Sequence, residues 1–466
     1  MDFIRISSSD IDYFKSIVGE SNVFFDPESI DKYSHDETED LRFAPEIVLK
    51  PVSSEEISSI LQYCNRQSIP VTPRGAGTGL SGGALPVFGG VALSVERMNH
   101  ILFIDERNHQ VTVEPGVITQ VLQEAVKEKG LFYPPDPASK GSCFIGGNIA
   151  ENSGGPKAVK YGVVKDYVLN LEVVLPTGEI IWTGANVLKN ATGYNLTQLI
   201  VGSEGTLGVV TKIVLRLIPH PAYDLLMLVP FRSAVQACEA VNAVFLAGII
   251  PSAMEFMERD AIDWTMNFVE TNLSIADEVA AHLLIEVDGN DPENLMGEME
   301  KISDVLKQFD IGEALFADTT EQKISLWKLR RSVAEAVKSN SVYREEDTVV
   351  PRAELPKLLS GVKEIGKKYG FKSVCYGHVG DGNLHVNIIK RDSSDEDWNE
   401  KLPLGIREIF QLCVKLGGTL SGEHGIGWVQ KPYMDIAFNE TQMKLMEQIK
   451  KVFDPNGIMN PGKIFY

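Results

Sequence analysis

The feature that most constrains this chain is a run of glycines that follows a short predicted strand. The segment PRGAGTGLSGG, residues 73–83, contains Gly77, Gly79 and Gly82 in the spacing of a dinucleotide-binding loop. Such a loop holds a pyrophosphate only where a helix begins directly after it. Here the chain continues as ALPVFGGVALSV, and the proline and two further glycines leave no place for a helix to start. This excludes nicotinamide dinucleotide binding in the Rossmann mode.

The same loop is still suited to hold an anion. Successive backbone N–H groups in a glycine-rich turn form a concave nest for phosphate oxygens, and Arg74 and Thr78 add donors. Two further glycine clusters, at 142–162 and 202–210, lie beside predicted strands. Because glycine lets the backbone approach a bulky ligand closely, the three clusters predict one large cofactor along the first domain. Tight surface turns without a cofactor are the alternative.

The composition is that of a globular protein with at least two domains. The chain has 466 residues, 44% of them hydrophobic, which is enough for large cores. Its net charge of −20 disfavours nucleic acid and anionic lipid as partners. The five cysteines are scattered and form no CxxC pair, which argues against a disulfide framework, a thiolate zinc site and an iron–sulfur cluster. Without a signal-like N-terminus or a long apolar run, we expect a cytoplasmic protein with no transmembrane segment.

Periodicity divides the chain into two parts of different character. Before residue 219 the patterns predict a strand at 46–49, a helix over 54–66, an amphipathic helix ending at Gly130, a hairpin turning at 176–178 and a long strand at 207–218. Pro219 and Pro221 then mark a domain boundary. Beyond it we expect strands at 224–231 and 282–289, and helices near 232–247, 292–308, 322–340, 354–369 and 395–416. This alternation is typical of a separate α+β domain.

Two histidines lie in the glycine-rich segment YGHVGDGNLHVNI, residues 376–388. Its glycines argue against a helix, so we expect a hairpin with a tight GDGN turn. His378 and His385 would then be neighbours across the strands, and Asn387 would share a face with His385. Histidines that are merely structural are the alternative.

A second glycine-flanked segment, SGEHGIG at 421–427, presents Glu423 and His424 side by side. Two imidazoles and one carboxylate, with positions left open for substrate, are a common layout for a catalytic divalent metal. His378, His385 and Glu423 are therefore candidate ligands, which leaves His424 free to act as a base.

A predicted helix at 326–339 carries Arg330 and Arg331. Adjacent helical residues point about 100° apart, so at most one of the two faces a pocket. A guanidinium is a natural bidentate partner for a substrate carboxylate. From spacing alone, a solvated helix face is the favoured alternative.

These segments together resemble the flavin-linked D-2-hydroxy-acid dehydrogenases, the group that includes D-lactate dehydrogenase, the glycolate oxidase flavin subunit and D-2-hydroxyglutarate dehydrogenase. The resemblance covers essentially the whole chain and rests on PRGAGTGLSGG, PPDPASKGSCFIGGNIAENSGG, VLKNATGYNLTQLIVGSEGTLGVVT, YGHVGDGNLHVN, SGEHGIG and FDPNGIMNPGKIF. It implies an α+β fold, with a two-lobed FAD-binding domain of the p-cresol methylhydroxylase/vanillyl-alcohol oxidase type at 1–219. A substrate (cap) domain with the metal-site hairpin would span 220–420, and a C-terminal segment, 421–466, would return to the FAD domain.

The resemblance also implies roles for individual residues. FAD would be non-covalent, since Thr78 stands in the loop where covalently flavinylated relatives often carry a histidine. The implied FAD-binding residues are Arg74, Gly75, Ala76, Gly77, Thr78, Gly79, Gly82, Ser142, Gly146, Gly147, Asn152, Gly155, Glu204, Gly208, Val209 and Asn460. Zinc, or else manganese, iron or cobalt, would be held by His378, His385 and Glu423, whereas Arg330 and Asn387 would hold the substrate carboxylate.

The implied reaction agrees with the residue-level reading. The metal polarises the α-hydroxyl group, His424 removes its proton, and the α-hydrogen passes as hydride to flavin N5, which leaves a 2-oxo acid. Because the chain has no cluster motif, its electrons would pass to an external acceptor such as an electron-transfer flavoprotein, quinone, cytochrome or iron–sulfur subunit. A homodimer is compatible with this reading.

One departure from the family pattern bears on the substrate. Relatives that act on hydroxyglutarate tend to carry a basic residue after the arginine helix, whereas this chain has Glu345, Glu346 and Asp347 there, beside Arg344. We therefore expect a small monocarboxylate, D-lactate or glycolate, with D-2-hydroxyglutarate as the alternative. A metal-dependent hydrolase without flavin and a flavoprotein that only relays electrons are further alternatives.

Overall fold

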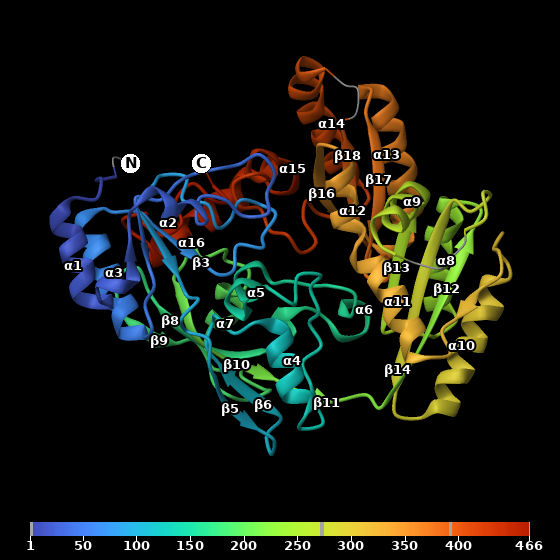
Figure 1. Cartoon of the computed structure of the whole chain (residues 1–466), viewed down its shortest axis with the longest axis horizontal. Helices are drawn as coiled ribbons and strands as arrows, with labels where there is room; N and C mark the ends of the chain where they lie inside the picture. The colour runs from blue at the N-terminus through green and yellow to red at the C-terminus, as the bar shows by residue number, and fades with distance from the viewer. Residues whose placement is uncertain (1–2, 271–274, 391–393, 466) are drawn as a thin grey trace. The chain divides into compact units, whose positions relative to one another are not determined.

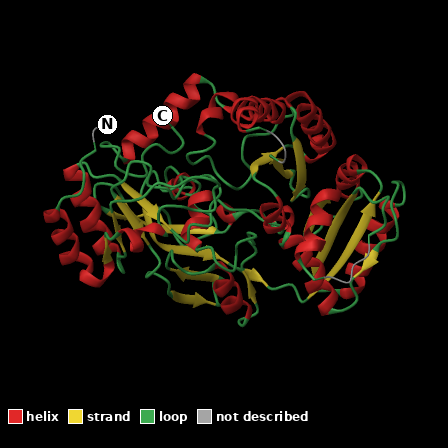
Figure 2. Cartoon of the chain, turned by 45° about the horizontal axis from the view of Figure 1, so that its top comes forward, coloured by secondary structure: helices red, strands yellow, loops and turns green. Residues whose placement is uncertain are grey.

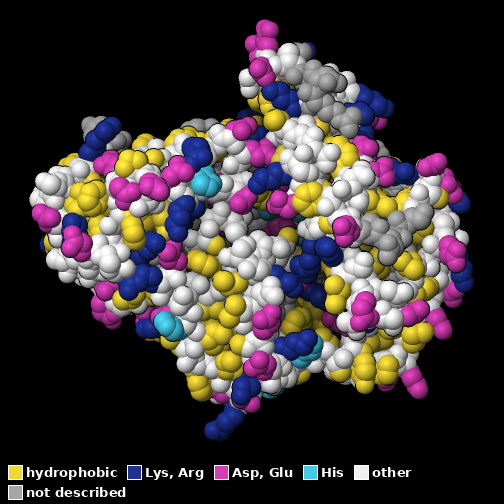
Figure 3. Space-filling view, in the orientation of Figure 1, with side chains coloured by type: hydrophobic (Ala, Val, Ile, Leu, Met, Phe, Trp, Pro, Cys, Tyr) yellow, Lys and Arg dark blue, Asp and Glu magenta, His cyan; other side chains and the backbone are white. Residues whose placement is uncertain are grey.

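The chain forms two compact units in the computed structural model, which describes residues 3–270, 275–390 and 394–465 (Figure 1). Unit 1 comprises residues 1–153, 163–220 and 423–466, and unit 2 comprises 154–162 and 221–422. The chain therefore enters unit 2 twice, first with a segment of nine residues and then with the long middle part. Acidic side chains are spread over the face drawn in Figure 3, with basic ones between them.

Unit 1 is built on two larger sheets. The first has the order β1 (Val23–Phe24), β2 (Ile47–Leu49), β4 (Val91–Ser94), β3 (Val71–Arg74), and β4 runs parallel to both of its neighbours. The second is antiparallel and has the order β5 (Ile101–Asp105), β6 (Gln110–Val113), β10 (Val209–Arg216), β8 (Val168–Val174), β9 (Ile180–Trp182). A short pair, β7 (Leu131–Phe132) and β11 (Ile218–Pro219), adds to them. The predicted strand at 46–49, the hairpin at 176–178 and the long strand ending near 218 are confirmed.

Unit 1 also contains helices, some of which contact these sheets. They are α1 (Ser8–Val18), α2 (Pro27–Asp31), α3 (Ser54–Gln67), α4 (Thr119–Lys127), α5 (Ile145–Glu151), α7 (Leu196–Ile200), α15 (Met434–Ala437) and α16 (Glu440–Phe453). The α3 helix begins where Ser53 accepts a hydrogen bond from the Glu56 N–H group, and it buries Ile57, Leu61 and Cys64 on one face. The same core contains Val174 and Val209 of the second sheet, so the two sheets share one hydrophobic interior.

The chain between β3 and β4 contains no helix, as the sequence predicts for the glycine loop. A Rossmann dinucleotide site is therefore absent from this loop, because such a site needs a helix N-terminus there.

Unit 2 has one antiparallel sheet of seven strands. Their order is β15 (Leu315–Phe316), β12 (Tyr223–Phe231), β14 (Ala281–Gly289), β13 (Ala253–Glu258), β17 (Lys372–Gly377), β18 (Asn383–Ile389), β16 (Tyr343–Val349). The two predicted strands and the predicted hairpin, β17 with β18, are confirmed. The sequence analysis did not predict β13 and β16, and both of them contribute to the site described below.

Helices flank this sheet, as Figure 2 shows in red. One layer comprises α8 (Ala234–Leu246), α10 (Pro292–Leu306), α13 (Leu355–Tyr369) and α14 (Asp395–Lys415), and the other comprises α9 (Arg259–Phe268), α11 (Thr320–Arg331) and α12 (Val333–Asn340). The single helix predicted near 322–340 is in fact two helices that meet at Ser332. The short α6 (Ala158–Tyr161) also belongs to this unit. No helix among the described residues is long and apolar enough to cross a membrane.

The sheet face that meets α9, α11 and α12 carries both a core and a polar row. Leu228, Met257 and Leu284 lie on it with the apolar side chains of these helices. The strand register places His385 opposite both Tyr376 and Asp347, and Asn387 opposite Glu345. Because directly opposed residues point to the same side of a sheet, these polar side chains share the face with the apolar core.

Candidate active site

Unit 1 contains a cavity of about 240 Å³ among the glycine loop, the segment around α5 and the turn before β10. Most of the predicted cofactor-binding residues line it, namely Arg74, Gly75, Ala76, Gly77, Thr78, Gly79, Gly146, Gly147, Glu204, Gly208 and Val209. Glu423 and His424 line the same cavity. The three glycine clusters of the sequence therefore contribute to one cavity of unit 1.

The cavity wall is shaped by glycines that leave room for a ligand. A Cβ atom added at Gly79 or at Gly147 would meet no other heavy atom within 4 Å, so the backbone faces open space at both positions. Gly77 has a φ of +79°, and a Cβ atom there would lie 2.3 Å from a guanidinium nitrogen of Arg74. The loop thus requires glycine at 77 for its conformation, whereas larger side chains at 79 or 147 would project into the cavity.

Two buried side chains tie distant segments to this cavity. The guanidinium group of Arg74 donates to the carbonyl oxygens of Lys32 (3.1 Å) and His35 (2.7 Å). The amide of Asn460 donates to the carbonyl oxygens of Gly83 (2.9 Å) and Glu204 (2.8 Å). Asn460 therefore connects the C-terminal tail to two walls of the cavity through backbone contacts.

The remaining predicted cofactor residues do not line the cavity. Ser142 is exposed and donates to the Ser139 carbonyl (3.2 Å), and the Asn152 side chain accepts from the Lys165 N–H (2.9 Å). The Gly82 N–H donates to the Thr38 hydroxyl (2.7 Å). Gly155 belongs to unit 2. Lining residues that the sequence analysis did not name include Gly83, Phe144, Glu151 and Ser153.

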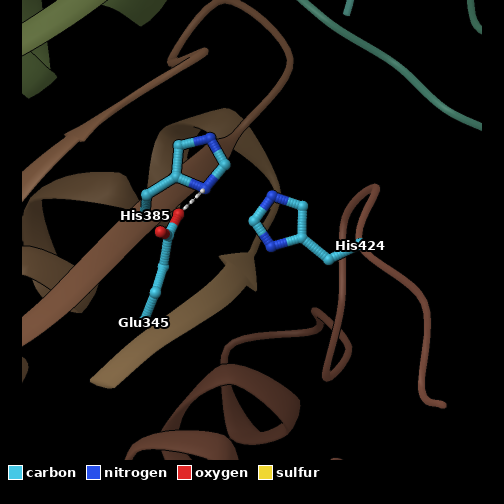
Figure 4. A group of neighbouring side chains, drawn as sticks. All are labelled: Glu345, His385 and His424. Carbon is cyan, nitrogen blue, oxygen red and sulfur yellow. Dashed lines mark ion pairs between the residues drawn. The ribbon is translucent and has the colours of Figure 1, made fainter. Parts of the chain in front are cut away.

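The two predicted histidine ligands lie together in unit 2. His378 follows β17, His385 lies within β18, and their ring centroids are 5.4 Å apart with nearly perpendicular planes. Nδ1 of His378 is 2.9 Å from both carboxylate oxygens of Glu255. Nδ1 of His385 is 3.3 Å from a carboxylate oxygen of Glu345, the ion pair dashed in Figure 4, and 3.6 Å from Asp347.

A carboxylate on one ring nitrogen is the usual partner of a metal-binding histidine. It orients the ring and leaves the other nitrogen, here Nε2, to the metal. Both His378 and His385 have this arrangement, so the donor chemistry of the pair fits a divalent ion. This orientation rests on Glu255, which was not named from the sequence, and on Glu345, which was named there only for its effect on the substrate.

Glu255 connects His378 to the predicted substrate-binding arginine. Its side chain is fully buried, and one oxygen lies 2.6 Å from a terminal nitrogen of Arg330. Burial alone would raise the pKa of Glu255, but the charge of Arg330 and the contact with His378 hold it below its ordinary value. Glu255 is therefore an ionised carboxylate inside the core, neutralised by Arg330.

Arg330 and Asn387 have buried polar atoms that the described residues leave unused. Arg330 is 6% exposed and its Nε has no hydrogen-bond partner there, whereas Arg331 lies over the Trp327 ring. Asn387 is fully buried, and neither polar atom of its amide makes a hydrogen bond of regular geometry with a described residue. Buried polar atoms are nearly always hydrogen-bonded, so this pair marks a place for a polar ligand.

Tyr376 lies between these groups. The Arg330 guanidinium sits over its ring, with 5.4 Å from Cζ to the centroid. Burial and the Glu345 carboxylate raise the pKa of the Tyr376 phenol well above its ordinary value, although Arg330 and the Asn387 amide oppose the rise. The phenol is therefore neutral at physiological pH.

The chain passes from unit 2 back to unit 1 directly beside β16. The Ser421 hydroxyl (2.7 Å) and the Gly422 N–H (2.8 Å) both donate to Asp347, which pairs with His385 in the strand register. Gly422 is the last residue of unit 2, and Glu423 and His424 are the first residues of the returning segment. The covalent chain thus begins this segment at the strand pair that carries His385.

Comparison with known proteins identifies the family. The model of the FAD-linked oxidase C-terminal domain matches residues 220–464, and that of an FAD-binding domain matches residues 45–184. Glycolate oxidase subunit GlcD of Bacillus subtilis is 41% identical, covering 93% of this chain and 92% of that protein. D-lactate dehydrogenase of Anaerostipes hadrus is 37% identical (99% and 98%), and D-2-hydroxyglutarate dehydrogenase of Stutzerimonas stutzeri is 33% identical (98% and 98%).

The fold is that of the vanillyl-alcohol oxidase and p-cresol methylhydroxylase group. The structure of p-cresol methylhydroxylase with substrate bound superposes with a TM-score of 0.80 at 19% identity, covering 97% of this chain and 96% of that one. The FAD-binding domain accounts for the glycine-lined cavity of unit 1, and the α+β architecture predicted from the sequence is confirmed. The chain belongs to the FAD-linked oxidases, as an oxidoreductase of the 2-hydroxy-acid dehydrogenase group.

Proposed function

We propose that this protein oxidises a small D-2-hydroxy acid, D-lactate or glycolate, to the 2-oxo acid with FAD and a divalent metal. The observation that carries the proposal is the buried pair of Arg330 and Asn387, whose polar atoms lack regular hydrogen bonds among the described residues, in the same unit as two histidines that face carboxylates. A hydroxy acid brings a carboxylate for the first pair and a hydroxyl oxygen for a metal on the histidines.

The substrate carboxylate is assigned to Arg330 and Asn387. Arg330 keeps one edge of its guanidinium on Glu255, and its unpartnered Nε remains for the substrate. The Asn387 amide supplies a second donor without adding charge. A charge-assisted bond to a buried guanidinium is stronger than a neutral one, so this pair fixes the acid in a defined orientation.

The metal is assigned to His378, His385 and Glu423. Glu255 and Glu345 face the Nδ1 atoms of the two histidines, so a metal would be bound through Nε2. Support for Glu423 comes from the chain itself, since the residue before it is held on Asp347, the strand partner of His385. When bound, a zinc ion or a similar divalent metal polarises the α-hydroxyl group of the substrate.

His424 is assigned as the base that takes the hydroxyl proton. It lines the cavity of unit 1 beside the glycine loop and Glu204, and this cavity is our proposed FAD site. A neutral imidazole can accept a proton near neutral pH, which is the task of a general base. FAD, which we propose to be non-covalent, would supply the hydride acceptor for the α-hydrogen, and the two electrons would then pass to an external acceptor.

The preference for a monocarboxylate rests on Glu345 and Asp347. Both carboxylates lie on the sheet face of His385 and Asn387, and both are buried or nearly so. A second carboxylate on the substrate would meet negative charge there. A D-2-hydroxyglutarate dehydrogenase is therefore the second candidate, kept because one relative of that name is 33% identical.

An anaerobic reduction experiment tests the proposal. The purified flavoprotein is mixed with D-lactate, L-lactate, glycolate and D-2-hydroxyglutarate, and the visible flavin absorbance is followed. We expect rapid bleaching with D-lactate or glycolate, slow bleaching with D-2-hydroxyglutarate and none with L-lactate. Full bleaching rate after verified metal removal would overturn the metal assignment, and unbleached flavin with every acid would overturn the activity.

Two histidine variants make this test specific. His378→Ala removes a proposed ligand, whereas His100→Ala removes a histidine whose side chain is 72% exposed in unit 1. We expect the first variant to lose metal and activity and the second to keep both.

A further inference from the structure

The segment that carries Glu423 and His424 is held by a buried carboxylate. The two oxygens of Glu204 accept hydrogen bonds from the backbone N–H groups of Ile426 (2.8 Å) and Gly427 (2.6 Å). Glu204 is 6% exposed, so water does not compete strongly for its oxygens. Bonds from an N–H group to an ionised carboxylate are stronger than neutral ones, and two of them fix both the position and the direction of the loop.

Glu204 is itself held firmly in unit 1. Its backbone has a φ of +52°, which is uncommon for a residue other than glycine, and its carbonyl oxygen accepts the Asn460 amide (2.8 Å). A strained backbone persists only where its surroundings determine it, and here Asn460 and the loop both do so. The carboxylate is therefore a fixed reference point rather than a mobile side chain.

Gly425 fits between two carboxyl groups. Its φ is +79°, and a Cβ atom there would lie 2.1 Å from Oε2 of Glu151 and 3.1 Å from Oε1 of Glu204. The loop backbone thus runs directly against both acids, and any side chain at 425 would push it away. The residue beside His424 is glycine for a packing reason that the sequence alone does not reveal.

Glu151 is the neutral member of this pair. Its Oε2 is buried without a hydrogen-bond partner among the described residues, and burial together with the Glu204 charge raises its pKa well above the ordinary value. Burial also raises the pKa of Glu204, although the N–H groups of Ile426 and Gly427 oppose that rise, so the proton of the pair is assigned to Glu151. One negative charge faces the loop instead of two.

We propose that Glu204 is a positioning residue of the oxidation, which acts by fixing the loop from which Glu423 and His424 project. The sequence resemblance assigns Glu204 to the cofactor site, whose cavity it lines, and both of its carboxylate oxygens also accept hydrogen bonds from the loop. The inference rests on the proposed function for the roles of Glu423 and His424. It adds a residue that touches neither the substrate nor the metal.

Hydrogen exchange of the holoenzyme tests this link directly. Glu204→Gln keeps the shape of the side chain but replaces one accepting oxygen with an N–H₂ group, so one of the two loop bonds is lost. A hydrogen bond to a charged group slows local opening of the loop by roughly 10- to 100-fold. We therefore expect hydrogen exchange of the Ile426 or Gly427 amide to accelerate by about that factor. The readout is the peptide that covers residues 421–430.

The matched control is Glu172→Gln in the same unit. Glu172 is also a buried glutamate, and it accepts bonds from Ser54, Thr211 and Lys212 but has no contact with the loop. We expect its variant to leave exchange at 421–430 unchanged. Gly425→Ala supplies a second perturbation that displaces the loop without altering Glu204, and it should accelerate exchange in the same peptide.

Activity measurements complete the test. In Glu204→Gln we expect kcat to fall about tenfold or more and metal affinity to weaken, with KM little changed. Exchange equal to that of the parent enzyme, or faster exchange with an unaltered kcat and metal affinity, would overturn the positioning role. If the parent enzyme oxidises no 2-hydroxy acid, the proposed function fails, whereas the exchange result still decides whether Glu204 fixes the loop.

Discussion

The most informative perturbation is Glu255→Gln, because this side chain serves two groups of the site at once. Glutamine keeps the volume of the fully buried side chain and removes its charge. One oxygen of Glu255 now lies 2.6 Å from Arg330, and both lie 2.9 Å from Nδ1 of His378. The substitution therefore leaves a buried guanidinium without its counter-charge and weakens the orientation of a proposed metal ligand.

Two magnitudes follow from this geometry. Loss of a carboxylate that orients a metal-bound histidine typically weakens metal binding by about 10- to 100-fold, or roughly 1.4–2.7 kcal/mol. Removal of one partner of a buried ion pair costs about 3–5 kcal/mol of folding stability. For a domain of the size of unit 2, each kcal/mol lowers the melting temperature by about 2–4 °C, so a decrease of roughly 6–20 °C is expected.

Metal titration against a chelator and thermal unfolding of the holoenzyme measure these effects. Glu258→Gln is the control, because Glu258 lies on the same strand, three residues further on, and pairs with Lys363 (2.7 Å). Successive strand residues alternate between faces, so Glu258 points away from the site. Unchanged metal affinity in Glu255→Gln, or an equal loss in Glu258→Gln, would refute the reasoning.

Three further predictions concern other parts of the molecule. Burial lowers the pKa of Lys463 in the folded chain to about 7, whereas the unfolded chain has the ordinary lysine pKa near 10.4. Between these two pH values the unfolded chain binds more protons, so the free energy of unfolding rises with pH. Urea unfolding at pH 7–10 should show no such rise in Lys463→Met and an unchanged rise in the control Lys451→Met, whose side chain is exposed. A persistent rise in Lys463→Met would contradict the assignment. Two like charges about 5 Å apart repel by roughly 3 kcal/mol at an effective dielectric constant of about 20. Glu345→Gln should therefore raise the ratio of kcat/KM for D-2-hydroxyglutarate to kcat/KM for D-lactate by up to about 100-fold. An unchanged ratio would count against the role of Glu345 in substrate choice. Gly147→Leu should project into the cavity and lower the bound FAD, measured by absorbance after gel filtration, whereas Gly297→Leu in α10 should keep it. Full FAD content in Gly147→Leu would show that FAD binds elsewhere.

Local signals in the sequence were sufficient for the loops of this protein. The GDGN turn predicts the hairpin of β17 and β18, and the strand register then places His385 and Asn387 on one face. The glycine loop at 73–83 is correctly separated from a Rossmann turn, because the absence of a following helix is visible in the chain itself. Turn chemistry acts over a few residues, so a single sequence contains it.

The segment at 154–162 shows where the same reasoning was insufficient. Its glycines suggested a cofactor loop, yet it belongs to unit 2, where Lys157 pairs with Glu286 and Lys160 pairs with Asp288 (2.7 Å). Glycine indicates that the backbone must turn or approach something closely, but it does not identify what is approached. The contacts that place this segment come from the two lysines, whose acidic partners lie in a strand about 130 residues away and cannot be identified from the segment itself.

The carboxylates that organise the site were beyond sequence reasoning for the same physical reason. Glu255 meets His378 across 123 residues, and Glu204 meets Ile426 across 222. One usable signal existed for Glu255, which stands in the strand segment AMEFME among apolar residues, where a charge is buried only if it is paired. That signal demands a cationic or hydrogen-bonding partner without naming one, and Arg330 and His378 become identifiable only when β13, β17 and α11 are in place. Glu204 carried no such sign, since glycine surrounds it on the chain and its partners are backbone N–H groups, which every residue except proline offers. Residues that touch a substrate are thus constrained by local chemistry, whereas residues that position them are constrained by the fold, and this is why Glu255 was missed and the loop contact of Glu204 was not predicted.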